Sequence, residues 1–303
     1  MNYYIADISN YQPNFDFRKF EELGGTGVIV KASMQLGFDS HYRIFAEKIR
    51  RTNLLFGIYH WVDPIPGSIA KQCDLFSTAI ETVHPDFICG DNEQWWADWN
   101  KYYLAIQKKI QFSEVPKLSS DRINKFSKDW FEEIHRRFPQ LTLFQYTGKW
   151  FIDGYCPQVK NWINQYPLWL AEYRKIDKVQ RLEDLVITGS PKLPDGTGTW
   201  EIWQFSSSMY LPGVNQEYKV DRPFDINLIR RDIDDFKDFI GLGEKTKTIK
   251  LKPDIVAIQV RKEPKEDSEF ITTISGQIKV ERSLYNDYYK IVDSGYIPKN
   301  YVE

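Results

Sequence analysis

Two carboxylic acids one residue apart, Asp91 and Glu93, have the types and the spacing to do chemistry together. They follow a short apolar run, residues 87–89, and precede two adjacent tryptophans. If residues 87–93 form a strand, both carboxylates point to the same face, roughly 7 Å apart at the backbone. Two like charges held that close beside indole rings raise the proton affinity of at least one of them. Hydrolysis of a glycosidic bond needs such a pair, with one acid protonated and the other ionised.

The same spacing also has a plainer interpretation. The triplet Asp-x-Glu is common in proteins, and Asp267 and Glu269 repeat it within a charged stretch that we interpret as a loop. Other parts of the chain must therefore decide whether the first triplet is catalytic.

Strand-like and helix-like patterns alternate along the chain up to about residue 175. The predicted strands are residues 3–8, 27–33, 56–62, 87–93, 141–147, 167–173, 200–206 and 224–228. The predicted helices are residues 17–23, 42–51, 69–80, 123–138 and 229–240. Alternation of this kind indicates parallel strands joined by crossover helices. Eight strands in roughly 240 residues match a closed barrel. We therefore predict an α/β fold, an irregular TIM-like β/α barrel whose last third is poor in helices.

In such barrels the carboxyl ends of the strands carry the functional residues. Polar or aromatic side chains fall at or near these predicted ends in strand after strand: Asp7, Lys31, Tyr59, His60, Asp91, Glu93, Tyr146, Tyr173 and Asp225. Convergence from several strands is much less expected by chance than one acidic triplet. It favours a catalytic site at this end of the barrel.

The C-terminal part of the chain has a different character. Residues 241–252 shift to Gly, Thr and Lys and are interpreted as a linker, and residues 253–303 read as short strands and turns. We expect residues 1–240 to form the barrel and residues 253–303 a small all-β barrel.

Composition excludes several classes of protein. The 303 residues carry a formal net charge of −2, so nothing favours a nucleic-acid or membrane-surface partner. Aromatic residues make up 16% of the chain, which suits stacking on sugar rings as well as core packing. Three widely spaced cysteines do not form a disulfide framework and fit synthesis in a reducing compartment. No window is apolar enough for a membrane helix, and the first residues do not have the pattern of a signal peptide.

Eight segments in order resemble one family: ADISNYQPNFDF, VIVKAS, GIYHW, DFICGDNE, YTGKWF, LWLAEY, WQFSSS and FDINLI. They resemble glycoside hydrolase family 25, the Chalaropsis-type lysozymes (muramidases) of bacteria, fungi and phages, over about residues 3–240. The tail, from VRKEP to GYIPKNYV, looks like a bacterial SH3-like cell-wall-binding domain.

The resemblance implies cleavage of the β-1,4 bond between N-acetylmuramic acid and N-acetylglucosamine in peptidoglycan, on an irregular β/α barrel. By position, Glu93 falls on the family's general acid/base and Asp91 on the second carboxylate of its D-x-E motif. Asp7 and Asp225 fall on two further acids that line the groove. The residues in motifs that line the sugar site are Tyr59, Tyr146, Trp169, Tyr173 and Gln204. The expected partner is cell-wall peptidoglycan, held in the groove and by the C-terminal domain of a monomer, with no nucleic acid, no membrane and no cofactor.

Three further residues are candidates for substrate contact. His60 ends a strand beside Tyr59, and its alternative role is a hydrogen-bonded barrel residue. Lys31 is interpreted as a hydrogen-bond partner at the barrel end rather than a Schiff-base nucleophile. Trp95 either stacks on sugar or covers the core. No histidine or cysteine pattern supports a metal site.

Two features depart from the family pattern: the Trp-rich segment QWWADWNKYY after the acidic triplet, and a long insertion-like loop over residues 175–198. The role of Asp91 also stays open at this stage. It either orients the substrate's 2-acetamido group for internal attack or attacks directly, and an inverting water held by Asp225 is a third route.

Two function classes follow from the sequence: an active peptidoglycan hydrolase, and an inactive wall-binding protein on the same barrel. For the hydrolase we expect a phage-type endolysin, made in the cytoplasm and reaching the wall once the membrane is permeabilised. A secreted autolysin whose leader has been removed is the alternative.

Overall fold

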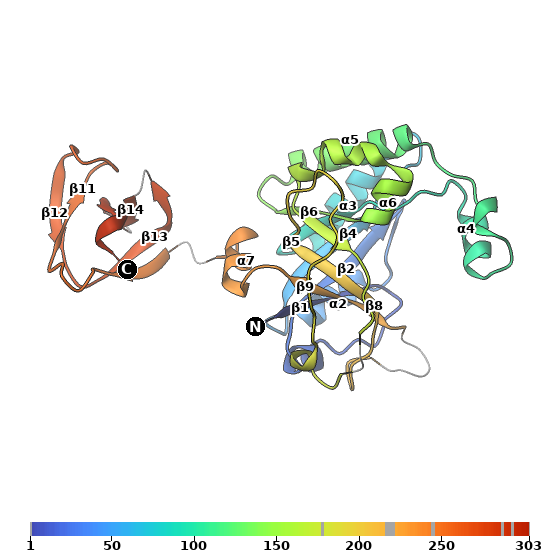
Figure 1. Ribbon diagram of the computed structural model, residues 1–303, viewed down its shortest axis with the longest axis horizontal. Helices are drawn as coiled ribbons and strands as arrows, with labels where there is room; N and C mark the ends of the chain where they lie inside the picture. The colour runs from blue at the N-terminus through green and yellow to red at the C-terminus, as the bar shows by residue number, and fades with distance from the viewer. Residues whose placement is uncertain are drawn as a thin grey trace. The chain divides into compact units, whose positions relative to one another are not determined.

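The computed structural model describes residues 2–176, 179–215, 222–243, 246–285, 288–291 and 294–302. The chain forms two compact units, Met1–Gly241 and Leu242–Glu303, each with its own sheet (Figure 1).

The first unit is built on a closed barrel of eight strands. They are β1 (Tyr3–Ile8), β2 (Gly25–Met34), β4 (Leu55–Trp61), β5 (Phe87–Asp91), β6 (Leu143–Gly148), β7 (Leu168–Ala171), β8 (Ile202–Met209) and β9 (Phe224–Ile229). Their order is β1-β9-β8-β7-β6-β5-β4-β2, and pairing of β1 with β2 closes the ring. β9 runs antiparallel to both of its neighbours, whereas the other neighbouring strands of the ring run parallel. The two-residue strand β3 (Gly37–Phe38) pairs with the end of β2. The predicted irregular β/α barrel is confirmed.

Helices follow most of the early strands. They are α1 (Phe17–Glu22), α2 (Tyr42–Ile49), α3 (Ile69–Val83), α4 (Trp99–Ile106), α5 (Ser120–Arg137), α6 (Lys149–Tyr155) and α7 (Ile233–Phe239). Single turns of 3-10 helix occur at η1 (Phe112–Glu114), η2 (Pro157–Asn161), η3 (Ile163–Gln165) and η4 (Leu182–Asp184). In the described residues between β7 and β9, η4 is the only helical turn. The expected shortage of helices in the last third is therefore confirmed.

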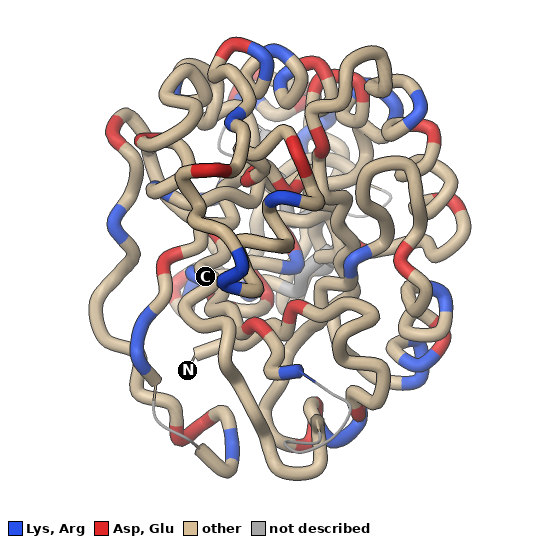
Figure 2. Tube along the Cα trace, turned by 90° about the vertical axis from the view of Figure 1, so that its right-hand side faces the viewer, with Lys and Arg blue, Asp and Glu red and all other residues tan. Residues whose placement is uncertain are grey.

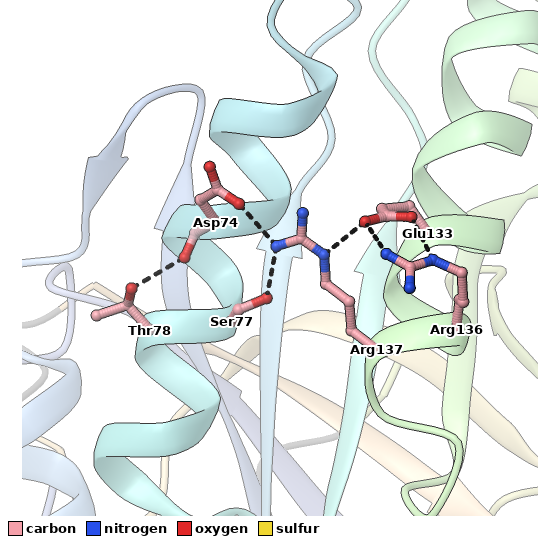
Figure 3. Close-up of polar contacts among 6 residues, drawn as sticks. All are labelled: Asp74, Ser77, Thr78, Glu133, Arg136 and Arg137. Carbon is pink, nitrogen blue, oxygen red and sulfur yellow. Dashed lines mark hydrogen bonds and ion pairs between the residues drawn. The ribbon is translucent and has the colours of Figure 1, made fainter.

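Helices α3 and α5 lie side by side against the barrel and are joined at their surface by Arg137 (Figure 3). Its guanidinium donates to Glu133 of its own helix, at 2.7 Å, and to Asp74 and Ser77 of α3, at 2.8 and 3.1 Å. Arg136 pairs with the same Glu133, and the two guanidinium groups lower the pKa of that carboxyl to about 2. Exposed ion pairs stabilise a fold only weakly. The apolar faces beneath them therefore hold the two helices in place.

Side chains inside the barrel alternate with side chains that face the helices. The inner set forms one apolar cluster with Phe236 and Ile240 from α7 and its C-terminal end: Ile5, Ile29, Leu55, Phe87, Cys89, Phe144, Tyr146, Trp169, Ala171, Ile202 and Ile229. Helix α7 closes the end where the parallel strands begin, because Phe236 packs against Phe87 and Phe144 with ring centroids 6.1 and 6.0 Å apart. Apolar residues fill this end of the barrel, so polar side chains gather at the other end.

The predicted elements of the barrel are present, with ends that differ by a few residues. Two short helices, α4 and α6, are absent from the sequence prediction. Ala105 is the one buried residue of α4, so the helix has no apolar stripe to reveal it. Across residues 175–198, the described part holds η4 and no other regular element.

The second unit is a single antiparallel sheet. Its strands are β10 (Thr246–Lys250), β11 (Ile258–Arg261), β12 (Phe270–Ile274), β13 (Gln277–Tyr285), β14 (Tyr288–Ile291) and β15 (Tyr296–Pro298), followed by η5 (Lys299–Tyr301). Their order is β10-β13-β14-β15-β11-β12, around an apolar core that includes Val260, Val280 and Ile297. The expected linker over residues 241–252 is shorter in the structure, since β10 belongs to this sheet. The SH3-like character of the unit stays a prediction.

Charges of both signs are interspersed along the trace in Figure 2, as the near-neutral composition suggests. Among the described residues, the helices are all too short or too polar to cross a membrane.

Candidate active site

Four carboxylic acids converge at the end of the barrel opposite α7. Asp7 lies in β1, Asp91 ends β5, Glu93 follows two residues later, and Asp225 is the second residue of β9. Asp7 and Asp225 are directly opposite in the β1–β9 ladder, where facing Cβ atoms are about 5 Å apart. Each of the four is within electrostatic reach of at least one other. The structure brings the four predicted acids together.

Asp225 reaches this end by a different route from the one predicted. It was expected at the carboxyl end of a parallel strand, but it lies near the start of β9. Because β9 runs antiparallel, its first residues meet the last residues of its neighbours. Strand β5 also stops at Asp91 instead of Glu93, although the Asn92 N–H still donates to the Tyr146 carbonyl at 2.9 Å.

Burial is the main cause of raised pKa values in this cluster. It raises the pKa of Asp7 and of Asp91 well above the usual range, and like charges add to the effect: Asp225 acts on Asp7, and Glu93 on Asp91. The pKa of Glu93 rises from its ordinary 4.5 to about 7, through burial and then the charge of Asp225. Burial raises the pKa of Asp225 to about 7 as well. The cluster therefore holds protons near neutral pH.

Gln204 links the acids to two tyrosines. Its Nε2 donates to Asp7 at 2.8 Å and to Asp225 at 3.4 Å. Its Oε1 accepts from the hydroxyls of Tyr146 and Tyr173, at 2.8 and 3.0 Å. Both ends of the buried Gln204 amide are hydrogen-bonded to protein groups. Gln204 therefore fixes the positions of the acids and tyrosines around it, and its side chain does not face an open groove.

The predicted aromatic residues lie at two levels. Trp169 is buried under the acids, with its ring 4.7 Å from that of Tyr146 and 6.2 Å from that of Tyr59. Its indole donates to Asn227 at 2.6 Å. Tyr173 is 55% exposed at the rim, so it is the member of this group most open to a ligand.

Lys31 supplies positive charge to the same cluster. Its charge lowers the pKa values of Asp7, Asp91 and Glu93, and so opposes the effect of burial. Its Nζ lies 5.4 Å from the ring centroid of Trp61, within cation–π range. Trp61 is absent from the sequence prediction, although it alternates with Tyr59 on β4 and shares its face.

Trp95 belongs to a hairpin-like excursion, residues 95–118, which we call the aromatic arm. The arm leaves the barrel after Glu93, carries α4, and projects from one side of the unit (Figure 1). Its two ends are paired, with backbone bonds of 2.8 Å from Ala97 to Pro116 and from Leu118 to Trp95. Trp95 stacks on Tyr155 with centroids 4.8 Å apart and is buried, so the structure favours packing over sugar stacking for this residue.

The prediction that His60 contacts substrate is wrong. The side chain is 0% exposed and points to the helices, since strand alternation places Tyr59 inside the barrel and His60 outside. Its ring nitrogens pair with Ser33 and Gln72, and burial lowers the His60 pKa to about 4. The alternative role, a hydrogen-bonded barrel residue, holds.

The remaining candidates for chemistry are groups of metal-ligating side chains and the three cysteines. No group of three or more potential ligands among the described residues is arranged to hold a metal ion. Cys73, Cys89 and Cys156 are buried free thiols, and burial raises the pKa of each, which makes them poor nucleophiles.

A closed β/α barrel with paired, proton-holding carboxylic acids at its mouth is the arrangement that acid-catalysed hydrolysis of a glycosidic bond requires. The chain belongs to glycosyl hydrolases family 25, whose family profile matches residues 6–214. The protein is therefore a peptidoglycan hydrolase of the lysozyme class, as the resemblance implied. Asp225 lies beyond the matched residues, yet the β1–β9 ladder places it opposite Asp7.

Solved structures share this fold at low sequence identity. The bacterial lysozyme from Streptomyces coelicolor aligns with a TM-score of 0.58 at 16% identity, covering 80% of this chain and 97% of that one. The family GH25 lysozyme from Aspergillus fumigatus gives 0.57 at 18% identity, covering 79% and 99%. The catalytic domain of the endolysin ply40 from Listeria monocytogenes bacteriophage P40 gives 0.53 at 15% identity, covering 80% and 98%. No curated protein sequence matches the chain.

Proposed function

We propose that the protein is an N-acetylmuramidase, which cleaves the β-1,4 bond between N-acetylmuramic acid and N-acetylglucosamine, with Glu93 as the general acid. The observation that carries this proposal is the position of Glu93: partly exposed at the barrel mouth, with its pKa raised to about 7. A carboxylic acid with that pKa is protonated often enough at neutral pH to donate, and it is acidic enough to give up its proton.

Asp91 is assigned to the substrate's 2-acetamido group. It is 4% exposed, and its Oδ1 accepts no hydrogen bond from the described residues. In this proposal an amide N–H of the sugar donates to the Asp91 carboxylate, which orients the amide carbonyl toward the anomeric carbon. As the carbonyl oxygen bonds to that carbon, the glycosidic C–O bond breaks and the leaving oxygen takes the proton from Glu93. Water then opens the cyclic intermediate and returns a proton to Glu93. Direct attack by Asp91 would also retain the anomeric configuration, whereas attack by a water held near Asp225 would invert it.

Replacement of the acid tests the proposal. Glu93→Gln keeps the size and polarity of the side chain but removes its proton transfer, so we expect a folded protein without hydrolysis. Glu47→Gln, at an exposed position of α2, is the matched control and should match wild type. The assay measures new reducing ends released from purified cell walls. A Glu93→Gln variant that retains most of its activity would exclude this residue as the acid.

Mass spectrometry of the products identifies the bond. Cleavage by a muramidase leaves N-acetylmuramic acid at the new reducing end, whereas a glucosaminidase leaves N-acetylglucosamine. An amidase frees amino groups and makes no reducing ends. An inactive wall-binding protein, the alternative that the family membership disfavours, would release neither.

We further propose that the second unit binds the cell wall as an SH3-like domain and that the whole protein acts as an endolysin. Support comes from its separate apolar core and from the likeness of the barrel to a phage endolysin domain. A variant that ends at Gly241, the boundary of the first unit, should lose wall binding and still cleave soluble glycan fragments. Loss of both activities would show that the barrel needs the second unit to fold. For the endolysin role, cells that express the protein should lyse only after their membrane is permeabilised.

A further inference from the structure

We propose that Asp63, buried between β4 and the aromatic arm, is a positioning residue for catalysis: it fixes the orientation of Gln94, beside the acid Glu93. The inference rests on the proposed role of Glu93 as the acid. It concerns a residue that lies outside the four converging carboxylates and has no role in the steps described above.

Hydrogen bonds fix both the side chain and the backbone of Asp63. It is 3% exposed, and its two carboxylate oxygens accept from different groups. Oδ1 accepts from Gln94 Nε2 at 2.7 Å, and Oδ2 accepts from the indole Nε1 of Trp99 at 2.8 Å. Its backbone is clamped by Gln72, which donates to the Asp63 carbonyl at 2.6 Å and accepts from its N–H at 3.1 Å. A buried carboxylate held this firmly is a rigid anchor for the groups that donate to it.

The hydrogen bonds require both carboxylate oxygens of Asp63 to act as acceptors. Gln94 Nε2 points to Asp63, and Gln94 Oε1 accepts from the indole Nε1 of Trp61 at 3.0 Å. An indole can only donate and an ionised carboxylate can only accept, so the amide of Gln94 has one permitted orientation. The same Nε2 also donates to the backbone carbonyl of Trp96 at 3.2 Å, at the base of the aromatic arm.

Two parts of the catalytic cluster depend on this chain of bonds. Gln94 is the residue after Glu93, so its side chain limits where the backbone can place the acid. Trp61 is the cross-strand neighbour of Asp91, and its ring lies 5.4 Å from Lys31 Nζ. Asp63 thus acts on the acid through the backbone of Gln94 and on the nearby cation through the ring of Trp61.

The variant Asp63→Asn tests the mechanism with almost no change in shape. Asparagine offers one acceptor and one donor where two acceptors are needed. Either Trp99 loses its acceptor, or Gln94 turns over and presents its Nε2 to the Trp61 indole, which also donates. We expect kcat to fall by about tenfold or more, since a displacement of the order of 1 Å at a reacting group has effects of this size. KM should change by less than about twofold, because Asp63 is buried away from substrate.

Making Asp63→Asn in the variant Trp61→Phe separates a positioning role of Asp63 from a purely structural one. In Trp61→Phe, the ring beside Lys31 remains but no donor faces Gln94, so a reversed Gln94 amide meets no clash. Asp63→Asn should therefore cost severalfold less kcat in the Trp61→Phe background than in wild type. Asp86→Asn is the matched control, because Asp86 is part-buried and accepts from the Phe56 N–H at 2.8 Å at the start of β4, away from the site. It should leave kcat unchanged.

The outcomes are distinct. Unchanged kcat in Asp63→Asn, or the same loss in both backgrounds with a parallel fall in Tm, would overturn the proposal. If Asp63→Asn does not fold, Trp61→Phe alone carries the test, since it breaks the same chain of bonds. It should lower kcat severalfold, and an unchanged kcat would overturn the proposal. Retained activity in Glu93→Gln would instead reject the assignment of the acid, whatever the two backgrounds show.

Discussion

The rate of hydrolysis should fall as the pH rises through about 7, and two single charge removals should move that fall in opposite directions. If Glu93 is the general acid, only the enzyme in which it is protonated can donate. Its pKa of about 7 therefore sets the alkaline limb of the pH–rate profile.

The size of the effect follows from that value. With a pKa of about 7, the protonated fraction of Glu93 falls from about 0.9 near pH 6 to about 0.1 near pH 8, so the rate should fall about tenfold. With the ordinary pKa of 4.5, only about 3% of the enzyme would carry the proton near pH 6. The difference between the two values corresponds to about 3 kcal/mol in favour of the protonated form.

Removing the charge of Lys31 or of Asp225 should move the alkaline limb, and the sign of the removed charge sets the direction. Lys31 lowers the Glu93 pKa, so Lys31→Met should move the alkaline limb to higher pH. Asp225 raises the same pKa, so Asp225→Asn should move the limb to lower pH. A unit charge within several ångströms in a partly buried site changes a pKa by about one unit. Each limb should therefore move by about one pH unit.

The assay is the initial rate of release of reducing ends from purified walls at constant ionic strength. The midpoint of the limb is informative even where a variant is slow, because it does not depend on the absolute rate. Movement of both midpoints in the same direction, or of neither, would refute the assignment of Glu93 as the titrating acid.

Three further predictions concern stability and the order of the site. The Glu93 pKa is higher in the folded chain than in the unfolded one, so its contribution to stability is present below about pH 4.5 and is lost as the pH rises through about 7. The Tm should therefore fall over that range, and less steeply in Glu93→Gln, when followed by calorimetry. Gly90→Ala should destabilise the barrel by about 1–3 kcal/mol in urea unfolding, because a Cβ there would lie 2.5 Å from two aromatic rings of α5. Gly154→Ala, with open space around it, is the control and should be neutral or stabilising. Gln204→Glu removes the donor to Asp7 and adds another acid, so kcat should fall at least tenfold while circular dichroism stays native.

Much of the barrel could be predicted from sequence because its strands are short apolar runs that end in polar residues. Asp7, Asp91 and Tyr146 each follow such a run, and the carboxyl ends of parallel strands meet at one edge. Glu93 was found through its spacing from Asp91. The antiparallel course of β9 was not visible, since a strand's direction depends on its neighbours in the sheet. The sequence therefore predicts the correct end of the barrel for Asp225, but from a parallel strand direction that β9 does not have.

Other parts of the site depend on which side of a strand each residue faces. His60 and Tyr59 are adjacent, and only the structure shows that the tyrosine faces the interior. Trp61 shares that face by alternation, so the sequence held a signal for it. The sequence gives no such signal for Asp63 and Gln94. These residues are 31 positions apart and interact through a single side-chain hydrogen bond.

The crowding of indoles at the base of the aromatic arm has an optical consequence. Four of the ten tryptophans, Trp61, Trp95, Trp96 and Trp99, lie in a row of contacts with ring centroids 5.0 to 6.1 Å apart. Transition dipoles at such separations couple, so this cluster should contribute an exciton signal to the circular dichroism of the protein. A change in that signal would report a change in the packing at the base of the arm without any added label.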